Sequence, residues 1–321
     1  MLEKISVEKI RLEQLESSTN PLQSEQWANL KVKNGWNPYP FRIRIAKRET
    51  TLLVLVKRLI FNYLIAYIPY GPPEGFYHDE LSNKLRLYLP KGVVFLRYDL
   101  PFGNTQKPNK VKILKESVQP EGSVILDLSG GYREVSSHYR QRARRHLKRG
   151  PLTITKYGGE EATFEKWYQL YRETAQREGF SPRSSSYIYQ FLNSGGELYC
   201  AYHKSEMVGG IVIFLSYPHA LYLFGTSKVV AKISPAYRLQ DYVIGELCER
   251  DFKSYDLHGI SGNQGRGSHL AGLDQFKLSF GGEKVTRHPS FDFPYRKLPY
   301  LIYAALERWR MKLHRQTTQD S

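Results

Sequence analysis

Cysteine and long apolar runs are both scarce in this sequence. The 321 residues contain two cysteines, Cys200 and Cys248, too few for a disulfide framework. Both fall in apolar segments, so we interpret them as reduced core residues of a cytoplasmic protein. The most apolar stretch, residues 51–68, is interrupted by Lys57 and Arg58. Its uninterrupted apolar run is far shorter than the about 20 apolar residues that cross a bilayer, which excludes a membrane-spanning helix.

Other features of the sequence exclude further classes of protein. The first ten residues, MLEKISVEKI, have no apolar core of a secretory signal. Glycine (25) and proline (17) stay near average usage, which argues against fibrous repeats and wholesale disorder. Acidic residues are outnumbered, with 31 Asp and Glu against 47 Lys and Arg, a net charge of +16. This surplus predicts an anionic partner: nucleic acid, a phosphate-bearing substrate or an acidic membrane face.

The order of predicted elements suggests the fold. A chain of this length normally forms two domains. After Gly150 the pattern of apolar residues gives the order β-α-α-β-β-β-α-β-α-β, which is that of the GNAT (acyl-CoA N-acyltransferase) fold. The first 130 residues are also mixed, with helices expected at 24–34 and 73–87 and strands at 41–47, 51–60, 63–72 and 92–100. We therefore predict an α/β (α+β) protein with two tandem GNAT-like domains.

An arginine-rich segment, residues 132–150, is the most strongly charged part of the chain. It carries seven Arg and Lys against one Glu. A narrow apolar stripe recurs every four residues and predicts one helix, at Val135, Tyr139, Ala143 and Leu147. Like charges on one helix repel each other, and an anionic partner relieves that repulsion. Phosphate or tRNA binding is expected at Arg140, Arg142, Arg144, Arg145 and Lys148. The alternative is a merely solvated helix face.

Six segments then match a known family in order. They are SEQWANLKVKNGW, VVFLRYD, YRQRARRHLKRG, SPAYRLQDYVIGEL, YDLHGI and QFKLSFGGE. Together they resemble the FemABX family of peptidoglycan-bridge aminoacyltransferases. The resemblance implies two GNAT-like domains, with the last helix returning to the first. No heptad-bearing insert of about 40 residues is visible, so the chain is similar to the FemX type without a coiled-coil arm. The expected domains are 1–148, completed by 296–321, and 149–295.

The resemblance also implies a reaction. It would move an amino acid from aminoacyl-tRNA to the stem-peptide amine of a peptidoglycan precursor, either lipid II or UDP-MurNAc-pentapeptide, in the cytoplasm. No cofactor or metal is expected, since aminoacyl-tRNA is itself the donor. Two alternatives stay open. One is a GNAT-type N-acyltransferase with acyl-CoA or an acyl carrier protein as donor. The other is a non-catalytic protein on the same fold that binds RNA or a membrane.

Two residues are candidates for the reacting centre. The family places the lysine of a Phe-Lys-x-x-Phe-Gly motif there, and Lys277 in QFKLSFGG is the match. The alternative is a solvated lysine between the core residues Phe276 and Phe280. Asp99 ends the strand GVVFLRYD, where its carboxylate could accept the amine proton or cap the turn announced by Pro101.

Four further residues are candidates for substrate binding. Lys31 matches a family lysine in a Trp-x-x-x-Lys context, with Lys33 as a competing match. Tyr237 and Arg238 open a predicted helix whose N-terminus suits an anion. The stretch before that helix lacks the glycines of a CoA-binding loop, which argues against acetyl-CoA. Tyr255 is expected either to face the same cleft or to lie in the core.

Three other features have competing interpretations. The glycine-rich stretch 262–272 follows the wrong strand for a CoA loop, and we interpret it as a loop lining the cleft. His258 and His269 have no Cys or carboxylate at ligand spacing, so zinc is not expected. The basic amphipathic segment 297–315 predicts a helix that packs on the first domain or lies on an acidic membrane face.

Overall fold

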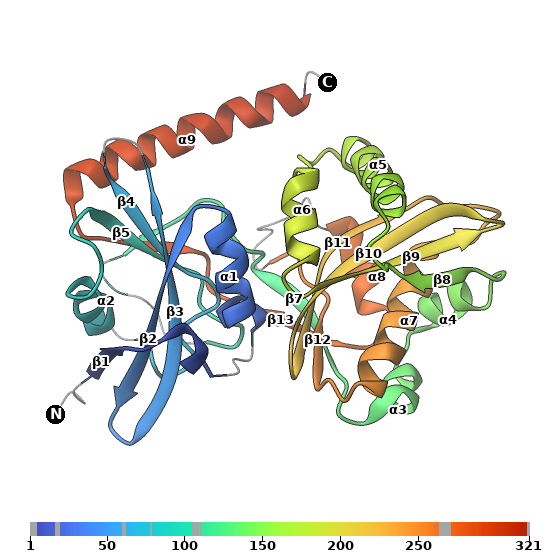
Figure 1. Cartoon of the computed structure of the whole chain (residues 1–321), viewed down its shortest axis with the longest axis horizontal. Helices are drawn as coiled ribbons and strands as arrows, with labels where there is room; N and C mark the ends of the chain where they lie inside the picture. The colour runs from blue at the N-terminus through green and yellow to red at the C-terminus, as the bar shows by residue number, and fades with distance from the viewer. Residues whose placement is uncertain are drawn as a thin grey trace. The chain divides into compact units, whose positions relative to one another are not determined.

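The computed structural model describes residues 5–16, 20–59, 62–77, 79–104, 109, 111–262 and 271–319. The chain divides into two compact units. Unit 1 comprises Met1–Gln119 and Arg287–Ser321, and unit 2 comprises Pro120–Thr286. Each unit contains its own seven-stranded sheet (Figure 1).

Unit 1 is a mixed sheet with helices on both faces. Its elements are β1 (Ile5–Lys9), 3-10 turns at Leu12–Gln14 and Pro21–Gln23, α1 (Glu25–Lys33), β2 (Trp36–Ile45), β3 (Arg48–Arg58), β4 (Leu64–Ile68), α2 (Asp79–Arg86), β5 (Val93–Tyr98), β6 (Lys112–Ile113), β14 (Phe291–Pro294) and α9 (Lys297–Gln319). The strand order is β1-β2-β3-β4-β5-β14-β6, with β4 and β5 parallel.

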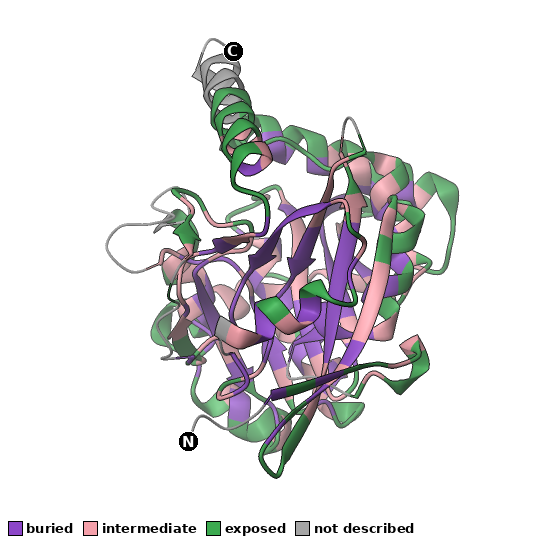
Figure 2. Cartoon of the chain, turned by 90° about the vertical axis from the view of Figure 1, so that its left-hand side faces the viewer, coloured by how far each residue is buried: buried purple, intermediate pink, exposed green. Residues whose placement is uncertain are grey.

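The central strand β3 is apolar without alternation because both of its sides are covered. Leu52 and Val54 lie in a core that also contains Leu81 of α2. α1 packs against β2 and β3. The buried Gln23 side chain bonds both backbone groups of Leu53 and so joins the segment before α1 to the sheet. Figure 2 shows these strands as the buried interior of unit 1.

Unit 2 repeats this layered arrangement. Its elements are β7 (Gly122–Asp127), α3 (Gly131–Ser137), α4 (Gln141–Leu147), β8 (Thr153–Lys156), α5 (Glu161–Glu178), α6 (Ser185–Leu192), β9 (Gly196–His203), β10 (Glu206–Ser216), β11 (His219–Ser227), α7 (Pro235–Glu249), β12 (Ser254–Asp256), α8 (Ala271–Leu278) and β13 (Glu283–Thr286). The strand order is β13-β7-β12-β11-β10-β9-β8, with β11 and β12 parallel. α3 and α4 pack against α7, and α5 packs against β10 and β11.

The two sheets share one arrangement of strands, and each contains one strand that comes from a distant part of the sequence. Counted along the sheet from β1 or β8, the fifth strand pairs parallel with the fourth, and an inserted strand takes the sixth position, between the fifth and the seventh. In unit 1 that inserted strand is β14, which follows β13 of unit 2 in the chain. In unit 2 it is β7, which follows β6 of unit 1. The units therefore exchange their inserted strands, and the prediction of two tandem GNAT-like domains is confirmed by this order.

This exchange places the boundaries between units elsewhere than we expected. The chain passes between units at Gln119–Pro120 and at Thr286–Arg287, against expected boundaries at 148/149 and 295/296. β7 lies in a part of the sequence for which we predicted no strand, but it pairs with β12 and β13. β14 pairs with β5 and β6 and so returns the chain to unit 1 earlier than the C-terminal helix does.

The arginine-rich segment forms two short helices, α3 and α4, where one was predicted. The backbone between them bonds to another part of unit 2, because Arg140 N–H donates to Ser279 O at 2.8 Å. Gly281, at φ +82°, approaches so closely that a Cβ there would lie 2.4 Å from His138 O. The predicted apolar stripe still reaches the core, at Val135, Tyr139, Ala143 and Leu147.

Candidate active site

Lys277 lies in the last turn of α8 and is 4% exposed. Its Nζ donates to Gly259 O at 2.7 Å and also to His258 O. His258 and Gly259 both adopt left-handed backbone conformations, at φ +47° and +72°. A non-glycine residue rarely does so. The turn presents two successive carbonyl oxygens to one ammonium group, which fixes the lysine head in place.

Burial makes this lysine easier to deprotonate. Loss of solvation lowers the pKa of Lys277 to about 8, against the opposing influence of Asp256 and Asp274. At pH 7 the charged ammonium therefore predominates, and the neutral amine becomes common above pH 8. Such a group can stabilise a developing negative charge or, when neutral, accept a proton.

Lys277 lies where two parallel strands separate. β11 and β12 pair from His219 to Leu221 on the β11 side, and the pairing stops there although β11 continues to Ser227. The Nζ of Lys277 lies over the ring of Tyr222, the next residue of β11, at 5.6 Å from the ring centroid. In open α/β sheets ligands bind beyond the carboxyl ends of parallel strands. This position makes Lys277 the centre of the candidate site.

Asp256, which sequence reasoning did not select, completes this corner of unit 2. Its buried carboxylate accepts hydrogen bonds from the Ser123 hydroxyl and, at 2.8 Å, from His258 N–H. Burial raises the pKa of Asp256. A carboxylate at the end of a buried strand was the signal that singled out Asp99, and Asp256 carries the same signal. Ser123 lies on β7 and could not be found while that strand went unrecognised.

Asp99 lies in unit 1 and is fully buried. Its carboxylate accepts a hydrogen bond from Tyr67 OH at 2.5 Å and another from the Ser290 hydroxyl. It also pairs with Arg287 at 2.9 Å, with both side chains fully buried. These partners hold β4, β5 and the segment before β14 together. The geometry therefore gives Asp99 a structural task, and the described bonds of its carboxylate run to these side chains.

The two aspartates stand at corresponding places. Each lies at the end of the fifth strand of its sheet and accepts a hydrogen bond from a serine on or beside the inserted strand. In unit 1 the neighbouring cation is Arg287, which stays charged at any accessible pH. In unit 2 it is Lys277, which titrates. The corresponding places thus hold a structural ion pair in unit 1 and an ionisable lysine in unit 2.

Tyr255 and Tyr237 are core residues. Tyr255 is fully buried and its OH donates to Gln240 at 2.9 Å, so the core alternative holds for it. Tyr237 accepts a hydrogen bond from Arg142 Nε at 2.8 Å. Its ring stacks on His146 at 4.2 Å between centroids. These contacts join α7 to α4 and leave little of either tyrosine for a substrate.

Arg238 and the turn before α7 also bond within the protein. Arg238 donates to Gly150 O at 2.8 Å. The backbone groups of Val230 and Ile233 bond each other in both directions, at 3.1 and 2.7 Å, with Ala231 and Lys232 at positive φ between them. A pyrophosphate at a helix N-terminus needs backbone N–H groups that point outward. This closed turn uses two of them internally.

Lys31 lies on α1 in unit 1, on the face that carries the buried Trp27. Its Nζ lies 4.4 Å from the Trp27 ring, a cation–π contact that positions the lysine. Lys31 is half-buried, whereas the competing Lys33 is exposed. The ordered position of Lys31 makes it the better candidate of the two for holding an anion.

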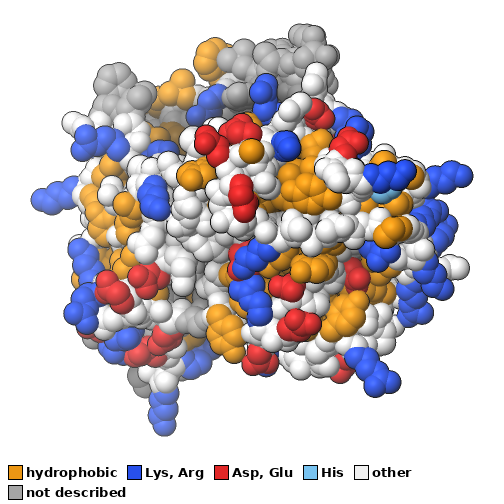
Figure 3. Space-filling model, turned by 45° about the vertical axis from the view of Figure 1, so that its right-hand side comes forward, with side chains coloured by type: hydrophobic (Ala, Val, Ile, Leu, Met, Phe, Trp, Pro, Cys, Tyr) orange, Lys and Arg blue, Asp and Glu red, His pale blue; other side chains and the backbone are white. Residues whose placement is uncertain are grey.

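The basic residues of α4 form an exposed surface on unit 2. It is made of Arg140, Arg142, Arg144, Arg145 and Lys148, which we call the α4 basic surface. Arg142 also bonds Gln275, and Arg144 donates to Ser137 O at 2.6 Å, so these two heads are oriented by the protein. Figure 3 shows Lys and Arg outnumbering Asp and Glu along the right-hand edge of the face in view.

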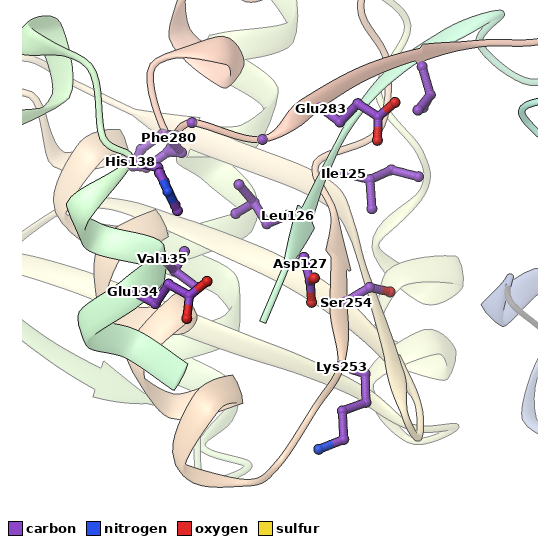
Figure 4. A pocket seen from close by; sticks show the side chains of 13 residues that line it. Ile125, Leu126, Asp127, Glu134, Val135, His138, Lys253, Ser254, Phe280 and Glu283 are labelled. Carbon is purple, nitrogen blue, oxygen red and sulfur yellow. The ribbon is translucent and has the colours of Figure 1, made fainter. Parts of the chain in front are cut away.

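A cavity of about 440 Å³ opens beside β7 and β13 (Figure 4). Its lining includes the three carboxylates of Asp127, Glu134 and Glu283 against one lysine, Lys253, and His138. Backbone and side-chain hydrogen bonds from Ser129 lower the pKa of Asp127 and keep it charged. Lys277 does not line this cavity. An acidic pocket is unsuited to phosphate, so we separate it from the candidate site.

Across the described ranges no three His, Cys, Asp or Glu side chains stand together as a metal-binding group. The carbonyl of His258 accepts a hydrogen bond from Lys277. His269, like residues 263–270 of the glycine-rich stretch as a whole, lies outside the described residues.

Comparisons with known proteins found a matching family model and similar solved structures. The model of the FemAB family matches residues 192–308, which contain Lys277, Asp256 and the separated strands. Over these residues the sequence matches the FemAB family, which supports the resemblance carried by the six segments. No curated protein sequence matches the chain.

Solved structures extend the likeness to both units. The crystal structure of FemX is 15% identical, covers 92% of this chain and 99% of its own, and has a TM-score of 0.72. A conserved protein of unknown function from Bacteroides thetaiotaomicron is 13% identical, with 90% and 99% coverage and a TM-score of 0.54. At such identities these structures establish the shared fold. As in the armless type, no coiled-coil arm is found in the described part of the chain.

Proposed function

We propose that this chain is an acyltransferase that moves an amino acid from aminoacyl-tRNA to the stem-peptide amine of a peptidoglycan precursor. The observation that carries the proposal is the buried Lys277, held by two backbone carbonyls at the separated strands of the family segment. No cofactor takes part, because the ester of the aminoacyl-tRNA is already activated.

The chemistry follows from the charge of Lys277. The acceptor amine attacks the ester carbonyl, a C–N bond forms, the carbonyl oxygen becomes negative, and the tRNA hydroxyl leaves as the amine loses its proton. An ammonium in a water-poor site stabilises the negative oxygen more strongly than water does. Lys277 is buried enough for this effect, and its fixed head needs no reorganisation during the reaction.

The identity of the donor rests on two features. The α4 basic surface offers cations for the phosphates of an RNA. The turn before α7 bonds its own amides, which disfavours the pyrophosphate of acyl-CoA and so the alternative GNAT donor. Both features favour aminoacyl-tRNA. The acceptor, lipid II or UDP-MurNAc-pentapeptide, is the precursor expected from the FemABX resemblance.

The α4 basic surface makes a testable contribution. We expect the double variant Arg145→Ala/Lys148→Ala to bind tRNA about 10-fold more weakly at 0.1 M salt and to lower the slope of log Kd against log salt by about 1–2, because each lost phosphate contact removes about one released counterion. Filter binding over a salt series measures both. The matched control, Lys166→Ala/Arg172→Ala, removes two exposed cations of α5. Equal weakening by the two pairs would contradict a localised RNA surface.

A transfer assay tests the function itself. The purified protein is incubated with tRNA charged with radiolabelled amino acids and with either lipid II or UDP-MurNAc-pentapeptide. We expect label on one precursor, lost after ribonuclease treatment of the donor. Transfer from acyl-CoA or a carrier protein instead would establish the alternative donor. Intact tRNA binding without transfer to either precursor would overturn the proposal.

A further inference from the structure

One face of α9 packs firmly on unit 1. Tyr300 and Tyr303 both contact Phe95 of β5, with ring centroids 5.4 and 4.9 Å apart. Glu307 bonds Arg97, whose guanidinium also pairs with Asp292 of β14. The prediction that this helix packs on the first domain is confirmed. Figure 2 shows α9 above the buried strands with its outer side exposed.

The opposite face of α9 is also apolar. At 100° per residue, a second set of large side chains projects away from Tyr300 and Glu307. Leu298 is 71% exposed and Trp309 63% exposed. We call this set the outer face of α9; it consists of Leu298, Leu301, Ile302, Leu306 and Trp309. A contiguous apolar face of this kind on a folded chain marks an interaction surface.

Cations border the outer face. Lys297 begins α9, and Arg308 and Arg310 lie on its two flanks near Trp309. Within the sequence from 296 to 310 the single acid is Glu307, which is engaged with Arg97. The border is therefore strongly positive, and the occupant of the outer face must be apolar at its centre and anionic at its rim.

We propose that the outer face of α9 docks on an anionic phospholipid bilayer. The helix would lie in the plane of the interface, with Leu301, Ile302 and Trp309 among the acyl chains and the arginines at the headgroups. A second copy of the chain fits less well, because a two-fold interface through α9 would bring the same cations together. No helix among the described residues is long and apolar enough to cross a membrane. The docking is peripheral and does not depend on the proposed chemistry.

Vesicle flotation tests the inference without tRNA or precursor, so its failure is separable from failure of the transfer reaction. The full chain is floated with vesicles of phosphatidylcholine alone or with 30% phosphatidylglycerol added, a fraction of about one third chosen to match an acidic leaflet. We expect binding to the mixed vesicles alone, weakened by salt. The variant Ile302→Gln/Trp309→Gln should bind at least about 10-fold more weakly, because two buried anchors are lost.

A control variant and a measurement of folding accompany the flotation experiment. Leu87→Gln/Val229→Gln removes two equally exposed apolar side chains elsewhere, at 77% and 66% exposure, and should bind like the wild type. Unchanged thermal unfolding of the outer-face variant shows that it is folded. Three results would overturn the inference: no binding to mixed vesicles, equal binding by the outer-face variant, or a lipid-independent dimer that this variant dissociates.

Discussion

We expect Lys277→Ala to lower the turnover number of the proposed aminoacyl transfer by about 10²–10³-fold, because the variant loses the buried cation that would face the developing oxyanion. Single-turnover transfer with saturating tRNA measures the chemical step. The KM for each substrate should change little, since Lys277 contacts the backbone of its own unit in the resting protein. Lys284→Ala, an exposed lysine of β13, is the control and should retain full turnover.

The pH profile distinguishes the two tasks open to Lys277. Its pKa is lowered to about 8, so the ammonium form is lost as the pH rises through 8. If the ammonium stabilises the oxyanion, turnover falls above pH 8 in the wild type and this alkaline limb is absent from the residual rate of Lys277→Ala. Turnover that climbs through pH 8 and levels off would instead assign Lys277 as a base. Full activity of Lys277→Ala at every pH would remove the lysine from the reaction.

Asp99→Ala destabilises unit 1 by about 3–5 kcal/mol, because it leaves the fully buried Arg287 without its carboxylate. Urea unfolding, followed by tyrosine and tryptophan signals, measures the loss. Arg287→Ala should have a similar cost, and the double variant should lose less than the sum because the two sites share one interaction. Turnover per folded molecule should persist, since the carboxylate is engaged by structural partners.

Two comparisons decide the role of Asp99. Glu206→Ala removes a carboxylate from an exposed pair with Lys228 and should leave unfolding unchanged. A stable Asp99→Ala variant that has lost turnover would contradict the structural assignment and restore Asp99 as a catalytic candidate.

The sequence predicts the two-domain α/β fold and its long strands, but it does not predict the short strands at which the chain passes between units. Long apolar strands such as β3 and β10 are evident because each contains an unbroken run of buried residues, 52–56 in β3 and 207–214 in β10. β7 and β14 have six and four residues, and neither reads as a strand in its local sequence. Their pairing partners lie more than a hundred residues away along the chain. Contacts made in the folded protein therefore decide whether these two segments form strands.

The candidate site shows a similar division. Lys277 was found through a short motif, but its two partners are carbonyl oxygens, which any residue type carries. The left-handed backbone at His258 leaves no signal in composition. Tyr255 and Tyr237 do stand out in the sequence, but their residue type is ambiguous, because an aromatic side chain near a site can pack in the core or contact a substrate. The arrangement of side chains decides between such alternatives.

The exchanged strands reverse the order in which the two halves can mature during synthesis. Unit 2 has all its strands once Thr286 has left the ribosome, whereas unit 1, although begun first, still awaits β14. Until then Arg97 has neither Asp292 nor Glu307, and Asp99 has neither Arg287 nor Ser290. Domains generally fold from the N-terminus as they emerge. Here residues made after unit 2 complete the unit begun before it, so a nascent chain truncated before residue 287 has every strand of unit 2 but lacks β14 of unit 1.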